Sequence, residues 1–372
     1  MKKGFSKKLI LLTLLFLLTA FLCSCKEKDV DDIPNENIPQ DNQDSQDNID
    51  SLDDKDEKPE PKNTDIVENT YELTILDDGE IIFYSSEGFY RYGPSIVDNG
   101  DGSMDMWLSS PGNSGSQWDW IAYRHSDNGT EWPNESIVLR PSPGSKDQCS
   151  VCDPAIIYFN GYYYLGYTAT DYYEGKGSYN MAYVARSRYP DGPFEKWNGS
   201  GWGGNPEPII FYDGGQDNWG IGELSFVIFD GDLCIYYTYI DVADRYVGLY
   251  KADLIDDWPG TMRNKGPVLY RLDQDSTEVV FDDYLNLFMA FTVDGRMMEG
   301  SNLKMYVSKN GKDFEEVAST KEYFEDYAHN LGVAKSLEGH IDSSKDLLIG
   351  YAYGQNWGRW NTKIQHIRVS KN

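Results

Sequence analysis

The chain has 372 residues, with 61 acidic against 33 basic side chains and a formal net charge of −28. This excess of negative charge repels phosphate groups, which excludes nucleic acids and anionic lipids as natural partners and leaves neutral or cationic ligands. The 28 Tyr, 10 Trp and 35 Gly fit short aromatic strands joined by tight turns, so an all-β fold is expected.

The first 25 residues have the pattern of a signal peptide. Four lysines precede an uncharged apolar run over residues 9–22, which is shorter than the ~18–20 residues that a membrane-spanning helix needs. The segment Leu22-Cys23-Ser24-Cys25 resembles the bacterial lipobox, which implies cleavage before Cys25 and a lipid on that cysteine. We therefore predict a lipoprotein anchored at the extracellular face of a bacterial cell membrane. The alternative is an ordinary cleaved signal with incidental cysteines.

Residues 26–70 have the composition of a disordered acidic linker. They hold 16 acidic residues against 5 lysines and no aromatic residue, so they lack the apolar surface that offsets the entropy of folding. We interpret them as a solvated tether rather than an acidic interaction tail. With this tether and the signal removed, residues 71–372 keep a formal charge of −21 and form the expected folded domain.

Three further cysteines lie in this domain: Cys149, Cys152 and Cys234. The spacing of the first two is compatible with loop cysteines or with a small local disulfide in an exported protein. A zinc site needs a second pair of ligands, and none follows at suitable spacing, so we expect no bound metal at this position.

A repeated unit of strand, turn, strand, loop and strand fills the domain. Residues 153–168 with 181–187 match residues 223–238 with 246–252, and weaker copies begin near residues 95, 278 and 331. A bulky aromatic residue closes the first four units at separations of 56–65 residues: Trp132, Trp197, Trp258 and Phe314. Such a period predicts a five-bladed β-propeller rather than a pair of β-sandwiches, with the strands of residues 71–86 closing the ring in the last blade.

The inner strands of a propeller start at one mouth of its channel, so their first residues gather there. Asp153 and Glu223 each lie 15 residues before a threonine, and Glu278 lies 14 residues before one. His329 opens the matching strand of the last blade, whereas the first blade has Gly93 there and no carboxylate. We therefore expect three acids and a histidine around one pocket. The alternatives are a strand-start turn for Asp153, a wet polar channel for the two Glu and a loop cap for His329 and Asn330.

The residues Asp153-Pro154 and Gly161-Tyr-Tyr-Tyr-Leu-Gly-Tyr-Thr168 resemble a signature of the five-bladed propeller glycosidases of families 43, 32 and 117. This resemblance implies hydrolysis of glycosidic bonds by a carboxylate pair, with Asp153 as the base and Glu223 or Glu278 as the acid. The resemblance to family 117 implies instead that His329 donates the proton. The resemblance to family 43 makes the same histidine one that organises a channel cation or water. A required cofactor is not expected, and a channel cation such as calcium stays open.

Loop aromatic residues are candidates for contact with a sugar, because an amphipathic ring stacks well on a pyranose face. The candidate substrate-binding residues are Asp119, Trp120, Trp219 and Trp357. The alternative for the tryptophans is packing between blades.

Two hypotheses follow. The first is a surface-tethered glycosidase, and the second is a glycan-binding lipoprotein on a degenerate enzyme scaffold; both predict a carbohydrate partner and a monomer. A phosphorolytic enzyme needs a cationic phosphate site, for which Arg124 and His125 are the compact basic pair.

Overall fold

The computed structural model describes residues 71–372 except 87–88, 115–116, 174–176, 216–217, 271–273, 321 and 372. The predicted signal peptide (1–25), the lipidated Cys25 and the tether (26–70) lie outside the described residues and stay predictions. Within the described part, the one helical element is a short 3-10 turn, η1 (Trp258–Thr261). It follows that no described helix is long and apolar enough to cross a bilayer.

The chain forms five antiparallel blades in sequence order, as the repeat predicts. Blade 1 contains β3 (Tyr92–Asp98), β4 (Met104–Ser114), β5 (Gln117–Ser126) and β6 (Asn134–Leu139). Blade 2 contains β7 (Ser150–Phe159), β8 (Tyr162–Tyr173), β9 (Gly177–Ser187) and β10 (Glu195–Lys196). Blade 3 contains β11 (Gly220–Phe229), β12 (Asp232–Ile240), β13 (Arg245–Asp253) and β14 (Arg263–Tyr270).

The last two blades complete the ring. Blade 4 contains β15 (Gln274–Asp282), β16 (Leu287–Asp294), β17 (Asn302–Ser308) and β18 (Glu315–Ser319). Blade 5 contains β19 (Ala328–Val333), β21 (Leu347–Tyr353) and β22 (Asn361–Lys371). The first two strands of the domain, β1 (Tyr71–Ile75) and β2 (Glu80–Phe83), both pair with β22. The two ends of the domain are therefore joined in one sheet, which closes the propeller as predicted.

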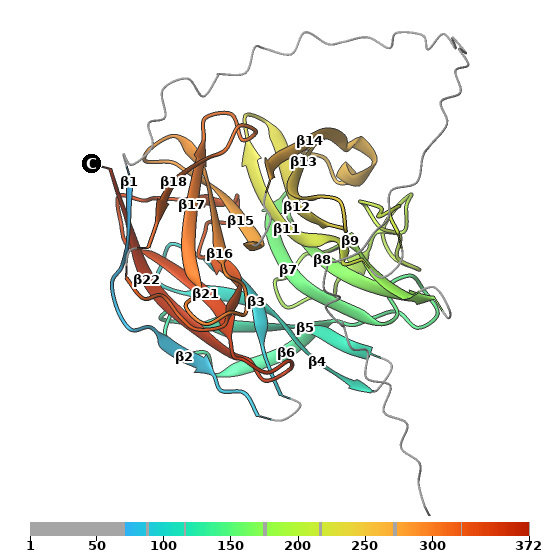
Figure 1. The fold of residues 1–372 in the computed structure, drawn as a ribbon. Helices are drawn as coiled ribbons and strands as arrows, with labels where there is room; N and C mark the ends of the chain where they lie inside the picture. The colour runs from blue at the N-terminus through green and yellow to red at the C-terminus, as the bar shows by residue number, and fades with distance from the viewer. Residues whose placement is uncertain are drawn as a thin grey trace, which may run out of the picture. The chain divides into compact units, whose positions relative to one another are not determined.

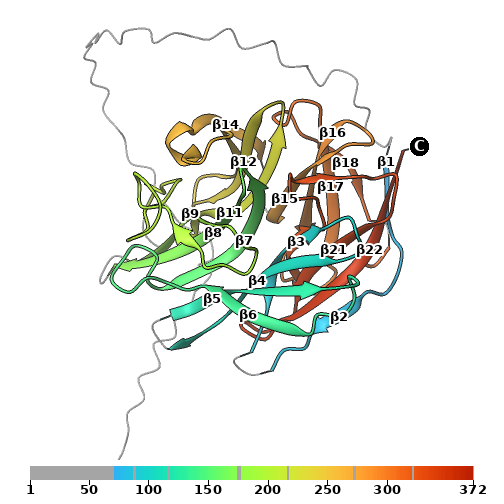
Figure 2. The same cartoon turned by 180° about the vertical axis from the view of Figure 1, so that it is seen from behind.

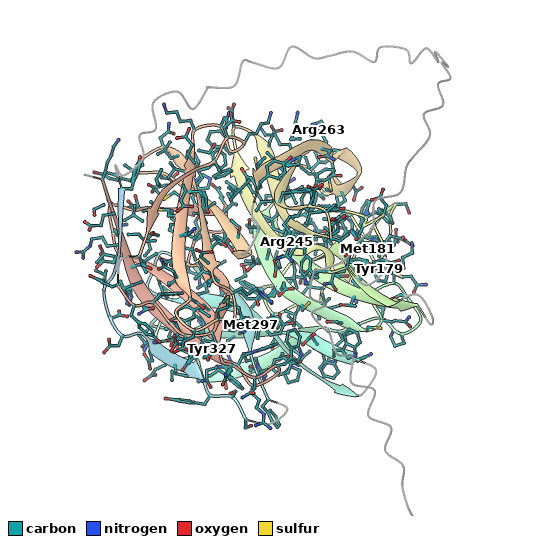
Figure 3. The ribbon with its side chains drawn as sticks, viewed as in Figure 1. Tyr179, Met181, Arg245, Arg263, Met297 and Tyr327 are labelled. Carbon is teal, nitrogen blue, oxygen red and sulfur yellow. The ribbon has the colours of Figure 1, made fainter. Side chains whose placement is uncertain are left out.

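The innermost strands are β3, β7, β11, β15 and β19, and each contacts the next around a common centre. Figures 1 and 2 show the sheets arranged as a ring, with β3, β7, β11 and β15 nearest its centre. Side chains fill the space between the sheets (Figure 3). Trp258, fully buried, packs edge-on against Tyr164 of blade 2 and Phe226 of blade 3, with ring centroids 6.1 Å apart in both cases. This tryptophan therefore holds two blades together, and its truncation to Ala would cost about 3–5 kcal/mol.

Every inner strand carries a two-residue β-bulge close to its start, where two residues face one on the partner strand. The bulges fall at residues 93–94, 153–154, 223–224, 275–276 and 330–331. In four of the five, the first bulge residue has a positive φ: Gly93, Asp153, Glu223 and Asn330. Because a bulge redirects the side chain of its strand, these five equivalent positions set what each blade presents at this mouth of the channel.

The opposite mouth is crossed by a stretch of chain between β19 and β21, which we name the closing segment (residues 335–341). Its backbone bonds in turn to the inner strands of blades 1 to 4: Asp98 N–H to Lys335 O (2.8 Å), Tyr158 N–H to Leu337 O (2.9 Å), Ile228 N–H to Glu338 O (2.9 Å) and Phe281 N–H to Gly339 O (3.1 Å). Its last two residues form β20 (His340–Ile341), which pairs in parallel with β15. One end of the channel is therefore covered by backbone.

The three cysteines of the domain are buried, and none of them forms a disulfide. Of the two alternatives for this pair, the local disulfide between Cys149 and Cys152 is therefore wrong. Cys152 lies on β7, where its thiol donates to the Asp153 carboxylate at 3.3 Å instead.

Candidate active site

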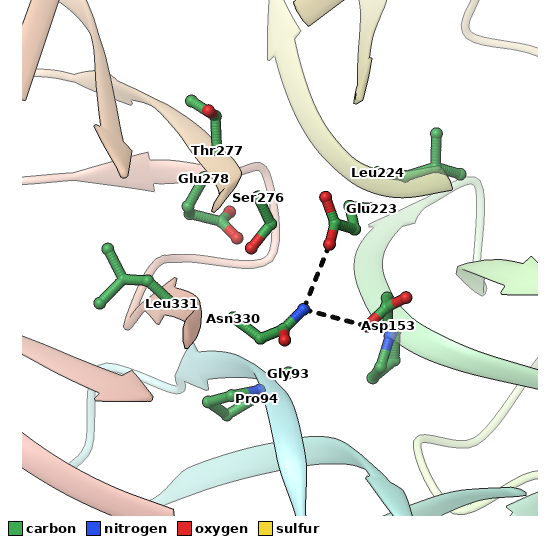
Figure 4. A pocket seen from close by; sticks show the side chains of 11 residues that line it. Gly93, Pro94, Asp153, Glu223, Leu224, Ser276, Thr277, Glu278, Asn330 and Leu331 are labelled. Carbon is green, nitrogen blue, oxygen red and sulfur yellow. Dashed lines mark hydrogen bonds between the residues drawn. The ribbon is translucent and has the colours of Figure 1, made fainter. Parts of the chain in front are cut away.

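A pocket lies at the mouth of the channel where the inner strands start (Figure 4). All five inner strands contribute to its wall. The lining residues are Gly93, Pro94, Asp153, Pro154, Glu223, Leu224, Ser276, Thr277, Glu278, Asn330 and Leu331. The three predicted carboxylates thus surround one pocket, as the strand pattern indicates.

The backbone at Asp153 and Glu223 is strained and firmly held. Their φ angles are 46° and 49°, in the left-handed region that Glu adopts rarely. In each case a hydroxyl on the second strand of the preceding blade accepts the backbone N–H at 2.8 Å: Ser109 for Asp153 and Thr168 for Glu223. The two carboxylates therefore occupy equivalent, preorganised positions, each fixed by its neighbouring blade.

Asn330 connects the two carboxylates. Its side-chain amide donates to Asp153 Oδ1 at 3.2 Å and to Glu223 Oε1 at 3.3 Å, and Figure 4 shows it between them. Since both oxygens contact one nitrogen, they lie no further apart than the sum of these distances, about 6.5 Å. Two carboxyl groups within this limit are close enough to flank a single glycosidic bond.

Glu278 lies deeper and has a different partner. The β15 register places residues 275–276 at the bulge, so the prediction that Glu278 shares the position of Asp153 and Glu223 is wrong. The reason is that β15 and β16 each have one more residue between the bulge and the turn than β7 and β8 have, and their turn has four residues instead of two. Glu278 instead accepts a charge-assisted hydrogen bond from the fully buried Lys335. Burial raises the pKa of Glu278, and the Lys335 ammonium opposes that rise.

His329 lies beside the pocket and does not line it. The register gives the bulge position of blade 5 to Asn330, so the prediction that His329 takes it is wrong by one residue. The imidazole is buried against the rings of Trp360 (4.8 Å) and Tyr92 (6.4 Å), and its Nδ1 contacts Asn330 Oδ1 at 2.7 Å. This contact orients the Asn330 amide so that its NH2 group faces the two carboxylates.

Asp119 belongs to a hydrogen-bonded wall behind Asp153. Its carboxylate accepts from Tyr90 Oη at 2.6 Å and from Ser150 Oγ at 2.8 Å. Burial raises the pKa of this carboxyl, and the hydrogen bonds from Tyr90 and Ser150 oppose the rise. Because its oxygens are already bonded, Asp119 is better suited to support the pocket wall than to bind a sugar directly.

The three predicted sugar-binding tryptophans lie in different settings, and none is among the residues that line the pocket. Trp120 stacks on the Arg140 guanidinium at 4.7 Å and donates to Gln117. Trp219 precedes β11 and is half-buried. Trp357 is 77% exposed and contacts Trp360 edge-on at 4.9 Å. Since Trp360 in turn packs on His329 beside Asn330, Trp357 is the exposed end of an aromatic row that runs from beside the pocket to the surface.

The basic pair considered for phosphate is already neutralised. Arg124 bonds Glu135 at 3.1 Å, and His125 bonds Asp105 at 2.8 Å. Across the described residues, no cluster of three or more His, Cys, Asp or Glu is arranged to hold a metal ion. The donor set around the pocket therefore offers acid/base groups and amides.

Two residues of this site were missed by the sequence reasoning. Asn330 was hidden because the closing segment lengthens the first hairpin of blade 5, so the 15-residue spacing seen in blades 2 and 3 does not recur. Lys335 carries no sequence signal of burial, since a lone lysine after a strand is normally exposed. The available clue to Asn330 was an Asn that follows a His at the start of a strand, in a blade that has no acid there.

Neither the protein-family models nor the curated proteins yield a match to this sequence. Solved structures do resemble it. A family 117 glycoside hydrolase from the marine bacterium Zobellia galactanivorans is 18% identical with a TM-score of 0.57, over 81% of this chain and 91% of that one. The α-L-arabinofuranosidase of Podospora anserina, solved with cellotriose, is 9% identical with a TM-score of 0.55, over 81% of this chain and 97% of that one.

An endo-arabinase from Bacteroides thetaiotaomicron is 16% identical with a TM-score of 0.51, over 77% of this chain and 97% of that one. These neighbours are five-bladed β-propeller glycoside hydrolases, and the chain shares their fold. At such low identity the likeness establishes the fold, and the activity has to be argued from the pocket.

Proposed function

We propose that the protein is a glycoside hydrolase that cleaves a glycan or oligosaccharide by general acid/base catalysis. The observation that carries this proposal is the pair of Asp153 and Glu223, held on equivalent strained bulges and joined through one Asn330 amide. A backbone strain repeated at two carboxylates in one pocket is costly for a merely structural role and is typical of catalytic sites.

Asp153 is assigned as the base or nucleophile and Glu223 as the acid. Asp153 receives hydrogen bonds from Asn330 and the Cys152 thiol, which stabilise its ionised form. Glu278 is the weaker candidate for the acid because its carboxylate is already bonded to the Lys335 ammonium. The anomer formed first, observed by proton NMR, distinguishes attack by water, which inverts, from attack by the carboxylate, which retains.

The substrate is proposed to be a neutral sugar chain that leaves the pocket along the aromatic row. Asp153, Glu223 and Glu278 face the pocket, and one ammonium, that of Lys335, contacts Glu278, so a uronate or sulfated sugar would be repelled. Outside the pocket, Trp357 and the 46% exposed Trp118 offer flat faces for the next sugar unit. Tyr90 links Trp118 to the aromatic row. Its hydroxyl donates to Trp118 O at 3.3 Å, and its ring packs on Trp360.

The test is sugar release from aryl glycosides and neutral oligosaccharides by the wild type and by Asp153→Asn. The variant should lose about a thousandfold in kcat/KM because its amide cannot accept a proton from water or attack the anomeric carbon. Asp230→Asn is a matched control, since Asp230 has a similar φ of 51° but lies at the far end of β11. Equal activity of Asp153→Asn and wild type would rule out the assignment.

A non-catalytic glycan-binding protein is the second candidate. At the bulge position blade 1 has Gly93 and blade 5 has Asn330, so these two blades contribute no carboxylate there. A binding protein does not need those carboxylates. This candidate predicts saturable oligosaccharide binding by calorimetry with no product from any substrate, and equal binding by Asp153→Asn.

The proposed enzyme acts at the extracellular face of a bacterial cell membrane, held there by a lipid on Cys25. The lipobox-like Leu22-Cys23-Ser24-Cys25 and the acidic stretch after it support this location. In cells fed an alkyne fatty acid, the wild type should be labelled and sediment with membranes, and Cys25→Ser should do neither. A labelled Cys25→Ser variant would contradict the assignment.

A further inference from the structure

The channel beneath the pocket contains a buried lysine. The Lys335 side chain is 0% exposed, and its ammonium donates to Glu278 Oε1, which faces the floor of the pocket. A buried lysine is rare unless it is paired, because burial removes the hydration of its charge. The Lys335 ammonium and the Glu278 carboxylate therefore compensate each other's buried charge.

The backbone of Lys335 is fixed from two sides, so its side chain cannot easily withdraw. Its N–H donates to Ile96 O at 3.2 Å, and its C=O accepts from Asp98 N–H at 2.8 Å. These bonds join the first residue of the closing segment to β3 of blade 1, next to the channel. From there the side chain reaches Glu278 on β15, which belongs to blade 4. The lysine thus connects the closing segment, where it is bonded to blade 1, to the inner strand of blade 4.

The residues around this position do not fit a bound metal ion. Calcium needs six to eight oxygen ligands at 2.3–2.6 Å, whereas the Glu278 oxygen already bonds an ammonium. The neighbouring inner-strand residues Val279 and Val280 are apolar and buried. In the described residues no group of three metal-binding side chains is present.

We infer that the Lys335 ammonium is the resident cation of the channel, covalently built into the closing segment, and that the protein takes up no metal ion there. The charge that balances Glu278 at the pocket floor is therefore permanent and independent of divalent cations in the surroundings. The closing segment has two roles in one stretch of chain: its backbone covers the far mouth, and its first side chain supplies the cation.

The test measures thermal unfolding of the full-length chain by circular dichroism. Wild type should show the same Tm within about 1 °C in EDTA and in millimolar calcium chloride. Lys335→Met leaves the Glu278 charge buried without a partner, so its Tm should fall by about 5–15 °C. Adding Glu278→Gln to this variant removes the unpaired charge and should recover most of the loss. Lys345→Met is the control, because Lys345 is 76% exposed in the same loop region and should change Tm little.

A second variant tests whether the position takes a cation at all. Lys335→Ala leaves a small void beside Glu278, so methylammonium should raise its Tm in a saturable way and should leave that of Lys345→Met unchanged. If Lys335→Met does not fold, the Lys335→Met/Glu278→Gln double variant must fold for the inference to hold.

Three outcomes would overturn the inference: a wild-type Tm that falls in EDTA and returns with calcium, a Lys335→Met variant as stable as the wild type, or a double variant no more stable than the single one. Since the readout is thermal stability, each result stands whether or not the protein hydrolyses glycans.

Discussion

The two mouths of the channel are built from the same five inner strands but use them in opposite ways. At the pocket mouth the strands start with bulges, and four of the five first bulge residues have left-handed backbones that turn side chains toward the centre. At the far mouth the strands end in regular hydrogen bonds to the closing segment. The comparison teaches that carboxylate and amide side chains line the mouth where chemistry is proposed, while backbone pairing stabilises the other end.

Of the two mouths, the closed one has the larger expected effect on stability. Gly339 has φ +83°, and a Cβ there would collide with the carbonyl oxygen of Phe226. Gly339→Ala should therefore cost about 2–4 kcal/mol, since backbone cannot move aside easily and alanine disfavours this conformation. Denaturation with urea measures this loss in the free energy of unfolding. Gly144→Ala is the control, because it shares a positive φ of 76° but has no atom near its Cβ. Equal losses in both variants would show that the closed mouth is not tightly packed.

At the pocket mouth the amide of Asn330 is the expected weak point of function. Asn330→Ala removes the donor that Asp153 and Glu223 share, so the two carboxylates lose their common orientation. We expect kcat/KM to fall about 100-fold, which corresponds to about 2.7 kcal/mol in the barrier. Steady-state kinetics on an aryl glycoside measures this, with circular dichroism to verify folding. An unchanged kcat/KM would mean that the amide only fills space.

The aromatic row should affect substrate binding and little else. Trp357→Ala removes a side chain that is 77% exposed, so the fold should be unaffected while KM for an oligosaccharide rises about fivefold through loss of stacking. Tyr284→Ala is the matched control, because Tyr284 is 65% exposed beside the closed mouth. A similar KM in both variants would place the sugar chain elsewhere.

The smallest effect concerns the pH dependence of stability at Asp119. Burial raises the pKa of this carboxyl above its ordinary 3.8. At pH values between the unfolded-state pKa and the native-state pKa, the native state therefore keeps a proton on Asp119 that the unfolded state has released. Stability due to this group therefore falls as pH rises through that window. Asp119→Asn should gain Tm relative to wild type from pH 4 upward, while the exposed Asp191→Asn should follow the wild type. A difference that shrinks with pH would contradict the direction.

The sequence predicts the architecture more fully than the site. Five blades and the closure by residues 71–86 follow from the repeated strands, because hydrophobic alternation and turns are local. Asp153 and Glu223 were located since their hairpins have matching lengths. Glu278 and His329 were misplaced in register, because longer hairpins in blades 4 and 5 change the spacing. The role of Lys335 depends on its contact from the closing segment to Glu278 on β15, and such long-range contacts leave no local pattern.

The most direct test of the acid/base pair is the dependence of kcat/KM on leaving-group pKa for a series of aryl glycosides. If Glu223 protonates the leaving oxygen, Glu223→Gln should be nearly normal on activated nitrophenyl leaving groups and lose about 10²–10⁴-fold on poor ones, which steepens the slope. Asp153→Asn should be slow on all of them with an unchanged slope. A steepened slope in Glu278→Gln, with a wild-type slope in Glu223→Gln, would contradict the account.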